Sequence, residues 1–178
     1  DETSGVAFRE MPHSHYRRLS AGNCVVVADT GAPPRGILSS QAHAGCLSFE
    51  LSSGANCFVV NAGAPVVGHS SYADFARMTA AHSTVTLGDR SCLSFSHSPF
   101  LGPIVTGGVR RVVVESLDEE GKHQGFAATH DGYAGSLKLL HRRKIRLLSS
   151  GHEVQGRDEI LRLDESSPQA DNRTMAVA

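Results

Sequence analysis

Short apolar runs closed by turn residues are the feature that most limits how this 178-residue chain can fold. Residues 24–28 are almost entirely β-branched or small, and residues 47–52 alternate strictly between apolar and polar side chains. Glycine, proline, serine or asparagine follows each run, at intervals of about 8–12 residues, which is typical of antiparallel strands. With no convincing helical period, the pattern predicts an all-β fold, an antiparallel β-sandwich or jelly-roll-like supersandwich.

Further runs extend the predicted sheets along the chain. Strands are expected at 13–19, 57–60, 83–87, 108–116, 124–130, 137–148 and 153–163. A loop with room for one short helical turn is expected at 65–79. Residues 137–148 would also suit a basic helix by propensity, but Gly151 favours a hairpin with the run that follows. We expect one sandwich domain over residues 1–163 and a disordered polar tail over 164–178.

Composition excludes some classes of partner. Lysine and arginine number 17 against 18 acidic residues, so no nucleic-acid partner is expected, because such surfaces carry a basic excess. No apolar run is long enough to span a membrane, so no membrane partner is expected. The four cysteines form no C-x-x-C pair, and Cys24 and Cys57 lie in apolar runs. We expect buried free thiols, with a disulfide or metal thiolate as the alternatives.

Three polar side chains recur at intervals of roughly 20 residues, which is about the spacing of successive strands together with their turns. They are His43, Asn61 and His82. Antiparallel neighbours can bring such positions together, and two imidazoles with an oxygen donor suit zinc or another divalent metal. The alternative is that the histidines are separately hydrogen-bonded at the starts of strands.

A second constellation occurs at the predicted turn after residues 124–130. His130, Asp131 and Tyr133 place an imidazole, a carboxylate and a phenol together, and His141 and Arg142 follow on the next strand. A His–Tyr pair can transfer protons, and arginine can hold a carboxylate. The alternative is a capped turn beside a solvated basic strand. Neither a G-x-S-x-G elbow nor a phosphate-binding loop is present.

The ordered set of segments resembles the C-terminal β-sheet domain of the heparinase II/III-like family. The resembling stretches are 16–19, 27–34, 42–51, 60–63, 77–84, 130–133 and 141–143. No single stretch is diagnostic, and the order is what makes the likeness specific.

This resemblance implies a polysaccharide lyase acting by β-elimination on a uronic-acid-containing polysaccharide. In such enzymes an (α/α) toroid precedes the sandwich, and the cleft lies between the two. The resemblance implies a structural zinc on His43, Asn61 and His82, with Asn61 where the family has aspartate. It places catalytic groups at Gln41, His130 and Tyr133. The expected substrate-binding residues are Arg77, His141 and Arg142.

Several departures from the family pattern bear on function. Gln41 stands where some members have a catalytic histidine, Gly45 stands where aspartate is common, and the toroid is absent from this chain. We therefore expect a domain cut from a longer protein, inactive alone, with an acidic polysaccharide and the missing toroid as partners.

Other hypotheses stay open beside this one. A non-catalytic carbohydrate-binding or assembly module is the alternative, and a cupin-type metal enzyme ranks last. A homodimer through exposed sheet edges is also compatible with the sequence. The compartment is undetermined, periplasm or cytoplasm of a bacterium.

Overall fold

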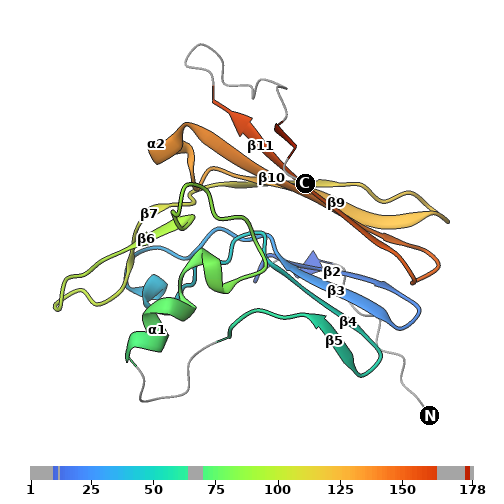
Figure 1. Cartoon of the computed structure of the whole chain (residues 1–178), viewed down its shortest axis with the longest axis horizontal. Helices are drawn as coiled ribbons and strands as arrows, with labels where there is room; N and C mark the ends of the chain where they lie inside the picture. The colour runs from blue at the N-terminus through green and yellow to red at the C-terminus, as the bar shows by residue number, and fades with distance from the viewer. Residues whose placement is uncertain (1–9, 12, 64–69, 164–174, 177–178) are drawn as a thin grey trace.

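Two five-stranded antiparallel sheets lie face to face in the computed structural model, which describes residues 10–11, 13–63, 70–163 and 175–176 (Figure 1). The first sheet follows chain order: β1 (Glu10–Met11), β2 (Tyr16–Ala21), β3 (Cys24–Asp29), β4 (Phe49–Ser53) and β5 (Asn56–Val59). The second has the order β12 (Met175–Ala176), β11 (Val154–Arg162), β10 (Leu139–Leu148), β9 (His123–His130) and β8 (Val112–Ser116). The predicted β-sandwich is therefore confirmed.

Smaller elements gather at one side of the sheets (Figure 1). They are the hairpin of β6 (Leu93–Phe95) and β7 (Val105–Gly108), the helices α1 (Ser70–Ala76) and α2 (Ala134–Leu137), and the 3-10 turns η1 (Gly36–Gln41) and η2 (Thr79–Ala81). None of the described helices is long and apolar enough to cross a membrane.

The core forms between the sheets from alternating strand positions. On β3, Cys24, Val26 and Ala28 are buried while the residues between them are half-buried. On β10, Ile145 and Leu147 face the same core, and Phe126 of β9 joins them. Each fully buried large apolar side chain contributes about 1.5–3 kcal/mol. The period of two confirms a strand over Leu139–Leu148, whereas Leu137 is the last residue of α2 and Lys138 is its C-cap.

The expected strand at 108–116 is wrong in one respect, because it breaks into two. The N–H groups of Arg110 and Arg111 both donate to Asp131 Oδ1, at 2.7 and 3.0 Å. A side chain thus takes the donors that a ladder would have used. As a result β7 pairs with β6, and β8 joins the second sheet.

Residues 83–87 do not form the expected strand. The Ser83 hydroxyl exchanges hydrogen bonds with the backbone of Phe49, at 2.8 and 2.5 Å, and the Thr84 hydroxyl donates to Cys46 O. These side-chain bonds tie the segment to the first residue of β4 and to the loop before that strand, in place of a ladder. The loop expected at 65–79, in which one short helical turn was allowed, contains the seven-residue helix α1; residues 64–69 lie outside the described part.

Two further expectations concern the cysteines and the tail. All four cysteines are free, as predicted, but Cys57 is exposed rather than buried. Within the predicted tail, Met175–Ala176 pairs with β11, and residues 164–174 and 177–178 lie outside the described part.

Candidate functional site

The predicted metal-binding residues line one cavity of about 520 Å³. His43, Asn61 and His82 all contribute to its wall, and so does Gln41, the residue expected to replace a catalytic histidine. The chain brings these four residues together from three separate segments. The structure also places Tyr16, Asp29 and Glu50 in the same wall.

Local backbone bonds hold the two histidine segments side by side. The Ala44 N–H donates to Arg77 O at 2.8 Å, and the Thr79 hydroxyl donates to Ala44 O at 2.8 Å. His82 follows η2 directly, and its N–H donates to Thr79 O at 3.0 Å. The segment that carries His43 and the turn that carries His82 therefore form one unit.

The two imidazoles are placed as a pair. Their ring centroids are 5.5 Å apart with an interplanar angle of 58°. Two imidazoles on one tetrahedral zinc ion would have centroids about 5 Å apart, given the usual Zn–N distance. His82 Nε2 is buried and has no hydrogen-bond partner among the described residues. A buried nitrogen without a partner among the described residues, beside a second imidazole, is an arrangement that suits a metal ligand.

Asn61 is a weaker component of this set. Its Oδ1 already accepts the Ser83 N–H at 2.9 Å, so one lone pair remains for a ligand. Within the described residues, no group of three or more His, Cys, Asp or Glu side chains is placed to hold a metal ion. The donor set is therefore limited to two imidazoles and one amide oxygen.

Burial keeps both histidines neutral. It lowers the pKa of His43, and the nearby Arg77 lowers it further. Burial also lowers the pKa of His82, with His43 as the second cause, while the nearby Ala76 backbone opposes the shift in both rings. Neutral imidazole is the form that binds metals, so the electrostatics favour ligation.

The rest of the cavity wall carries negative charge. Burial raises the pKa of Asp29 to about 6, partly offset by the Gly31 N–H and by His15. Burial, Asp29 and Glu50 together raise the pKa of Tyr16. The described lining residues include no lysine or arginine. At neutral pH this cavity suits a cation better than a carboxylate-bearing sugar.

Part of the second predicted constellation forms a buried series of hydrogen bonds, here called the relay, that runs from His130 through His141 to Asp158. His130 is 1% exposed and His141 0% exposed, and His130 Nε2 lies 3.1 Å from His141 Nδ1. The Gly132 N–H donates to His130 Nδ1 at 3.0 Å, so the proton of the neutral His130 ring sits on Nε2 and points to His141. His141 Nδ1 accepts that hydrogen bond. The N–H at His141 Nε2 donates in turn to Asp158 Oδ1 at 2.8 Å.

Arg143 completes this relay and connects it to the cavity. Its Nε and Nη2 bind the two oxygens of Asp158 at 2.7 and 2.8 Å. Its Nη1 donates to Leu47 O at 2.7 Å and Ser83 O at 2.5 Å, beside the segments that carry His43 and His82. Leu47 has a left-handed backbone, with φ of 62°, which this contact helps to hold.

Burial and charge explain the ionisation states within the relay. Burial, then His141 and Arg143, lowers the pKa of His130 to about 3. Burial alone would raise the pKa of Asp158, but hydrogen bonds from His141 and Arg143 outweigh it and hold that pKa well below its usual value. At neutral pH the relay therefore contains neutral His130 and ionised Asp158.

The remaining predicted residues also have internal partners. Tyr133 is 0% exposed and donates to Val85 O at 2.6 Å, and burial raises its pKa. Arg77 donates to Ser40 O and to Pro103 O, and its guanidinium lies over the Phe95 ring. Arg142 pairs with Glu115 at 2.8 Å. None of these three residues, nor His130 or His141, is among the described lining residues of the His43 cavity.

Sequence reasoning missed Asp29 and Asp158. Asp29 directly follows the apolar run at 24–28, and Asp158 lies within the strand expected at 153–163. The register of β10 and β11 could have indicated Asp158, because it lies directly opposite Arg143 in that pairing.

The fold and this histidine-lined cavity define an antiparallel β-sandwich domain with a candidate metal site. Residues 3–175 match the family described as heparinase II/III-like, C-terminal, and the chain belongs to that family.

Two similar proteins are longer than this chain. It is 29% identical over 183 residues to the FtsZ-localized protein C of Caulobacter vibrioides (strain NA1000 / CB15N), covering 100% of this chain and 31% of that protein. A heparinase III structure has the same fold, with a TM-score of 0.60 and 18% identity over 88% of this chain and 21% of that one. The chain therefore spans less than a third of either relative.

Proposed function

We propose that this chain is the β-sandwich portion of a longer polysaccharide lyase-like protein, and that it binds zinc or a similar divalent metal between His43 and His82. The observation that carries the proposal is the pairing of these rings at 5.5 Å, with His82 Nε2 unpartnered among the described residues. Asn61 would contribute the free lone pair of its amide oxygen. When bound, the ion would supply a structural cross-link between the segments after η1 and η2.

We further propose that the whole protein acts by β-elimination on a uronic-acid-containing polysaccharide, with proton transfer not supplied by His130 or Tyr133. Both side chains are buried and hydrogen-bonded within the domain, so they have no path to a polymer substrate. Gln41 faces the cavity, but an amide does not titrate. The remaining proton-transfer groups would come from the other domain of the longer protein.

Exposed apolar side chains support the proposal that a second domain packs against this one. Large apolar side chains are exposed on three segments that Arg77 ties together: Ile37 and Leu38 on η1, Phe75 and Met78 at and just after the end of α1, and Phe100 and Leu101 in the β6–β7 loop. Leu38 is 75% exposed and Phe100 is 97% exposed. Arg77 joins the three segments through its bonds to Ser40 O and Pro103 O. Apolar surface of this kind marks an interface, and we assign it to the (α/α) toroid; a homodimer is the alternative.

Metal binding is tested with His82→Ala. The wild-type chain is expected to retain about one zinc per chain after dialysis, and His82→Ala to lose it, because one of two imidazoles is gone. Zinc in excess should stabilise the wild-type chain by about 2.7 kcal/mol at a hundredfold excess over Kd. Metal analysis and thermal unfolding with zinc or a chelator measure both effects.

His152→Ala is the matched control, because His152 is exposed in the β10–β11 turn. It should keep the metal and the zinc-dependent rise in Tm. Equal zinc content in the wild-type chain and His82→Ala would contradict the site.

Catalysis is tested by following unsaturated-uronate absorbance on heparan-type polysaccharide and alginate. The chain alone is expected to show no turnover, and the full-length protein to show it. Turnover by the chain alone would contradict the assignment of proton transfer to another domain.

The same assay tests the alternative, a non-catalytic binding or assembly module. That alternative is favoured by the likeness of the whole chain to a relative named for its localisation with FtsZ. A full-length protein that holds metal but shows no turnover would establish it.

A further inference from the structure

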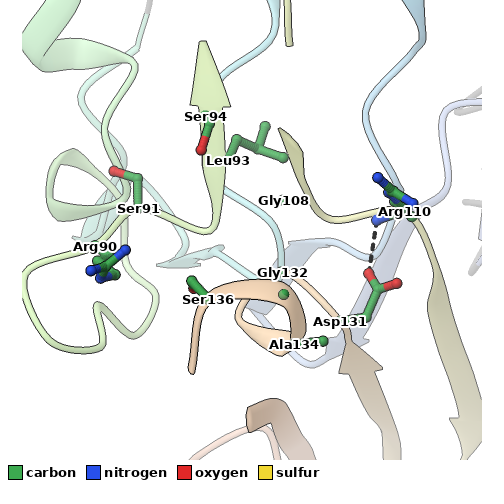
Figure 2. Close-up of a pocket in the computed structure, with 11 residues that line it drawn as sticks. Arg90, Ser91, Leu93, Ser94, Gly108, Arg110, Asp131, Gly132, Ala134 and Ser136 are labelled. Atoms are coloured by element: carbon green, nitrogen blue, oxygen red, sulfur yellow. Dashed lines mark hydrogen bonds between the residues drawn. The ribbon is translucent and has the colours of Figure 1, made fainter. Parts of the chain in front are cut away.

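A second cavity, of about 660 Å³, opens where the β6–β7 hairpin meets the turn before α2. Its polar lining residues are Arg90, Ser91, Ser94, Arg110, Asp131 and Ser136 (Figure 2). Backbone forms part of its wall at Gly132. A Cβ there would lie 2.8 Å from both Cys92 O and Val109 Cγ2, so no side chain can occupy the position.

Two guanidinium groups in this cavity are without partners. Within the described part of the chain, neither the Arg90 nor the Arg110 side chain makes a hydrogen bond or an ion pair. Figure 2 shows them on opposite sides, with Gly132 and Ser136 between them. The other arginines discussed above differ, because Arg77, Arg142 and Arg143 bind carbonyls or carboxylates.

The one carboxylate in the wall is partly satisfied. Asp131 Oδ1 accepts the N–H groups of Arg110 and Arg111, at 2.7 and 3.0 Å. These bonds spread part of its charge into the backbone. Two guanidinium groups therefore face one hydrogen-bonded carboxylate, and the cavity carries net positive charge. This is the reverse of the His43 cavity, whose wall contains Asp29 and Glu50.

We propose that this cavity binds a small oxyanion between Arg90 and Arg110, with the hydroxyls of Ser91, Ser94 and Ser136 as further hydrogen-bonding groups. Arginine binds phosphate and carboxylate oxygens through paired N–H groups, which gives both charge and geometric match. The oxyanion is either free or carried by a hydroxylated molecule, whose hydroxyl groups the serines would bind. This cavity shares only Leu93 with the described lining of the His43 cavity, and the proposed site does not depend on metal binding there.

The test is calorimetric titration of the chain with inorganic phosphate, glucose 6-phosphate and glucose. Both phosphates are expected to bind, and uncharged glucose is not. Arg90→Ala and Arg110→Ala should each weaken phosphate binding at least about tenfold, as expected for the loss of a charged hydrogen bond. Because the arginines are exposed, binding should also weaken as ionic strength rises.

Arg146→Ala is the matched control, because Arg146 is an exposed arginine on β10 outside this cavity. It should leave phosphate affinity unchanged. Ser94→Asp provides a second variant, which adds a negative charge to the wall and should weaken binding without removing an arginine. Tighter binding of glucose 6-phosphate than of phosphate would identify a carried oxyanion, and equal binding a free one.

Three results would overturn the proposal. The first is no phosphate binding at about 20 mM, which corresponds to an affinity too weak for a site. The second is a loss of phosphate affinity in Arg146→Ala equal to that in Arg90→Ala and Arg110→Ala. The third is binding of glucose as tight as that of glucose 6-phosphate.

Discussion

Gly108→Ala is expected to lower the free energy of unfolding by about 4 kcal/mol, the sum of left-handed strain and overpacking. Gly108 has φ of 102°, and a Cβ would lie 2.1 Å from Cys92 O and 2.7 Å from Leu93 Cα. Both atoms belong to the backbone of β6 or the residue before it, so neither can move aside as a flexible side chain would. Urea unfolding followed by circular dichroism measures the loss.

Gly107→Ala is the control in the same hairpin. Its nearest neighbour would be the Ser94 side chain at 3.8 Å, which is ordinary contact. This variant should unfold within about 1 kcal/mol of the wild type, in the range of a surface or strand substitution. Equal losses in the two variants would show that the close approach at Gly108 does not limit stability.

Arg143→Met is expected to cost about 3 kcal/mol, the low end for breaking a buried ion pair because Asp158 keeps some solvent contact. The change leaves Leu47 O and Ser83 O without this donor, and leaves Asp158 bonded to His141 without its guanidinium partner. Arg146→Met, at an exposed position on the same strand, should have little effect. Urea unfolding compares the two variants.

A double variant separates the charge from the packing. Asp158→Asn in the Arg143→Met background should recover part of the lost stability, because the uncompensated buried charge is removed. No recovery would mean that the two carbonyl contacts, rather than the ion pair, account for the loss.

Strand periodicity predicted most of the sandwich correctly because each strand buries one face. The run at 137–148 is the clearest case, since β10 alternates buried positions with partly buried or exposed ones from His141 to Leu147. The failures lie where side chains replace ladder bonds. Asp131 breaks the expected strand at Arg110, and Ser83 ties its own segment to Phe49. Contacts between residues so far apart in sequence leave no mark on local periodicity.

The candidate site residues also fall into two groups, those that residue type and spacing could select and those whose role depends on packing. Residue type and spacing were enough to select His43, Asn61 and His82, which the structure places in one cavity. Residue type alone also selected His130 and Tyr133 for proton transfer, but burial is a property of the packed sheets. The β9–β10 and β10–β11 registers put His130 opposite His141, and Arg143 opposite Asp158, inside the domain.

The sequence by itself determined the all-β class, most strands, the family resemblance and the three candidate metal ligands. It could do so because alternation and residue type are local properties of the chain. Only the tertiary structure decided which polar groups face solvent and which are buried. It turned one constellation into an internal relay, left His82 Nε2 unpartnered among the described residues, and opened the Arg90–Arg110 cavity. Burial and hydrogen-bond partners depend on segments distant in sequence, so no local pattern contains them.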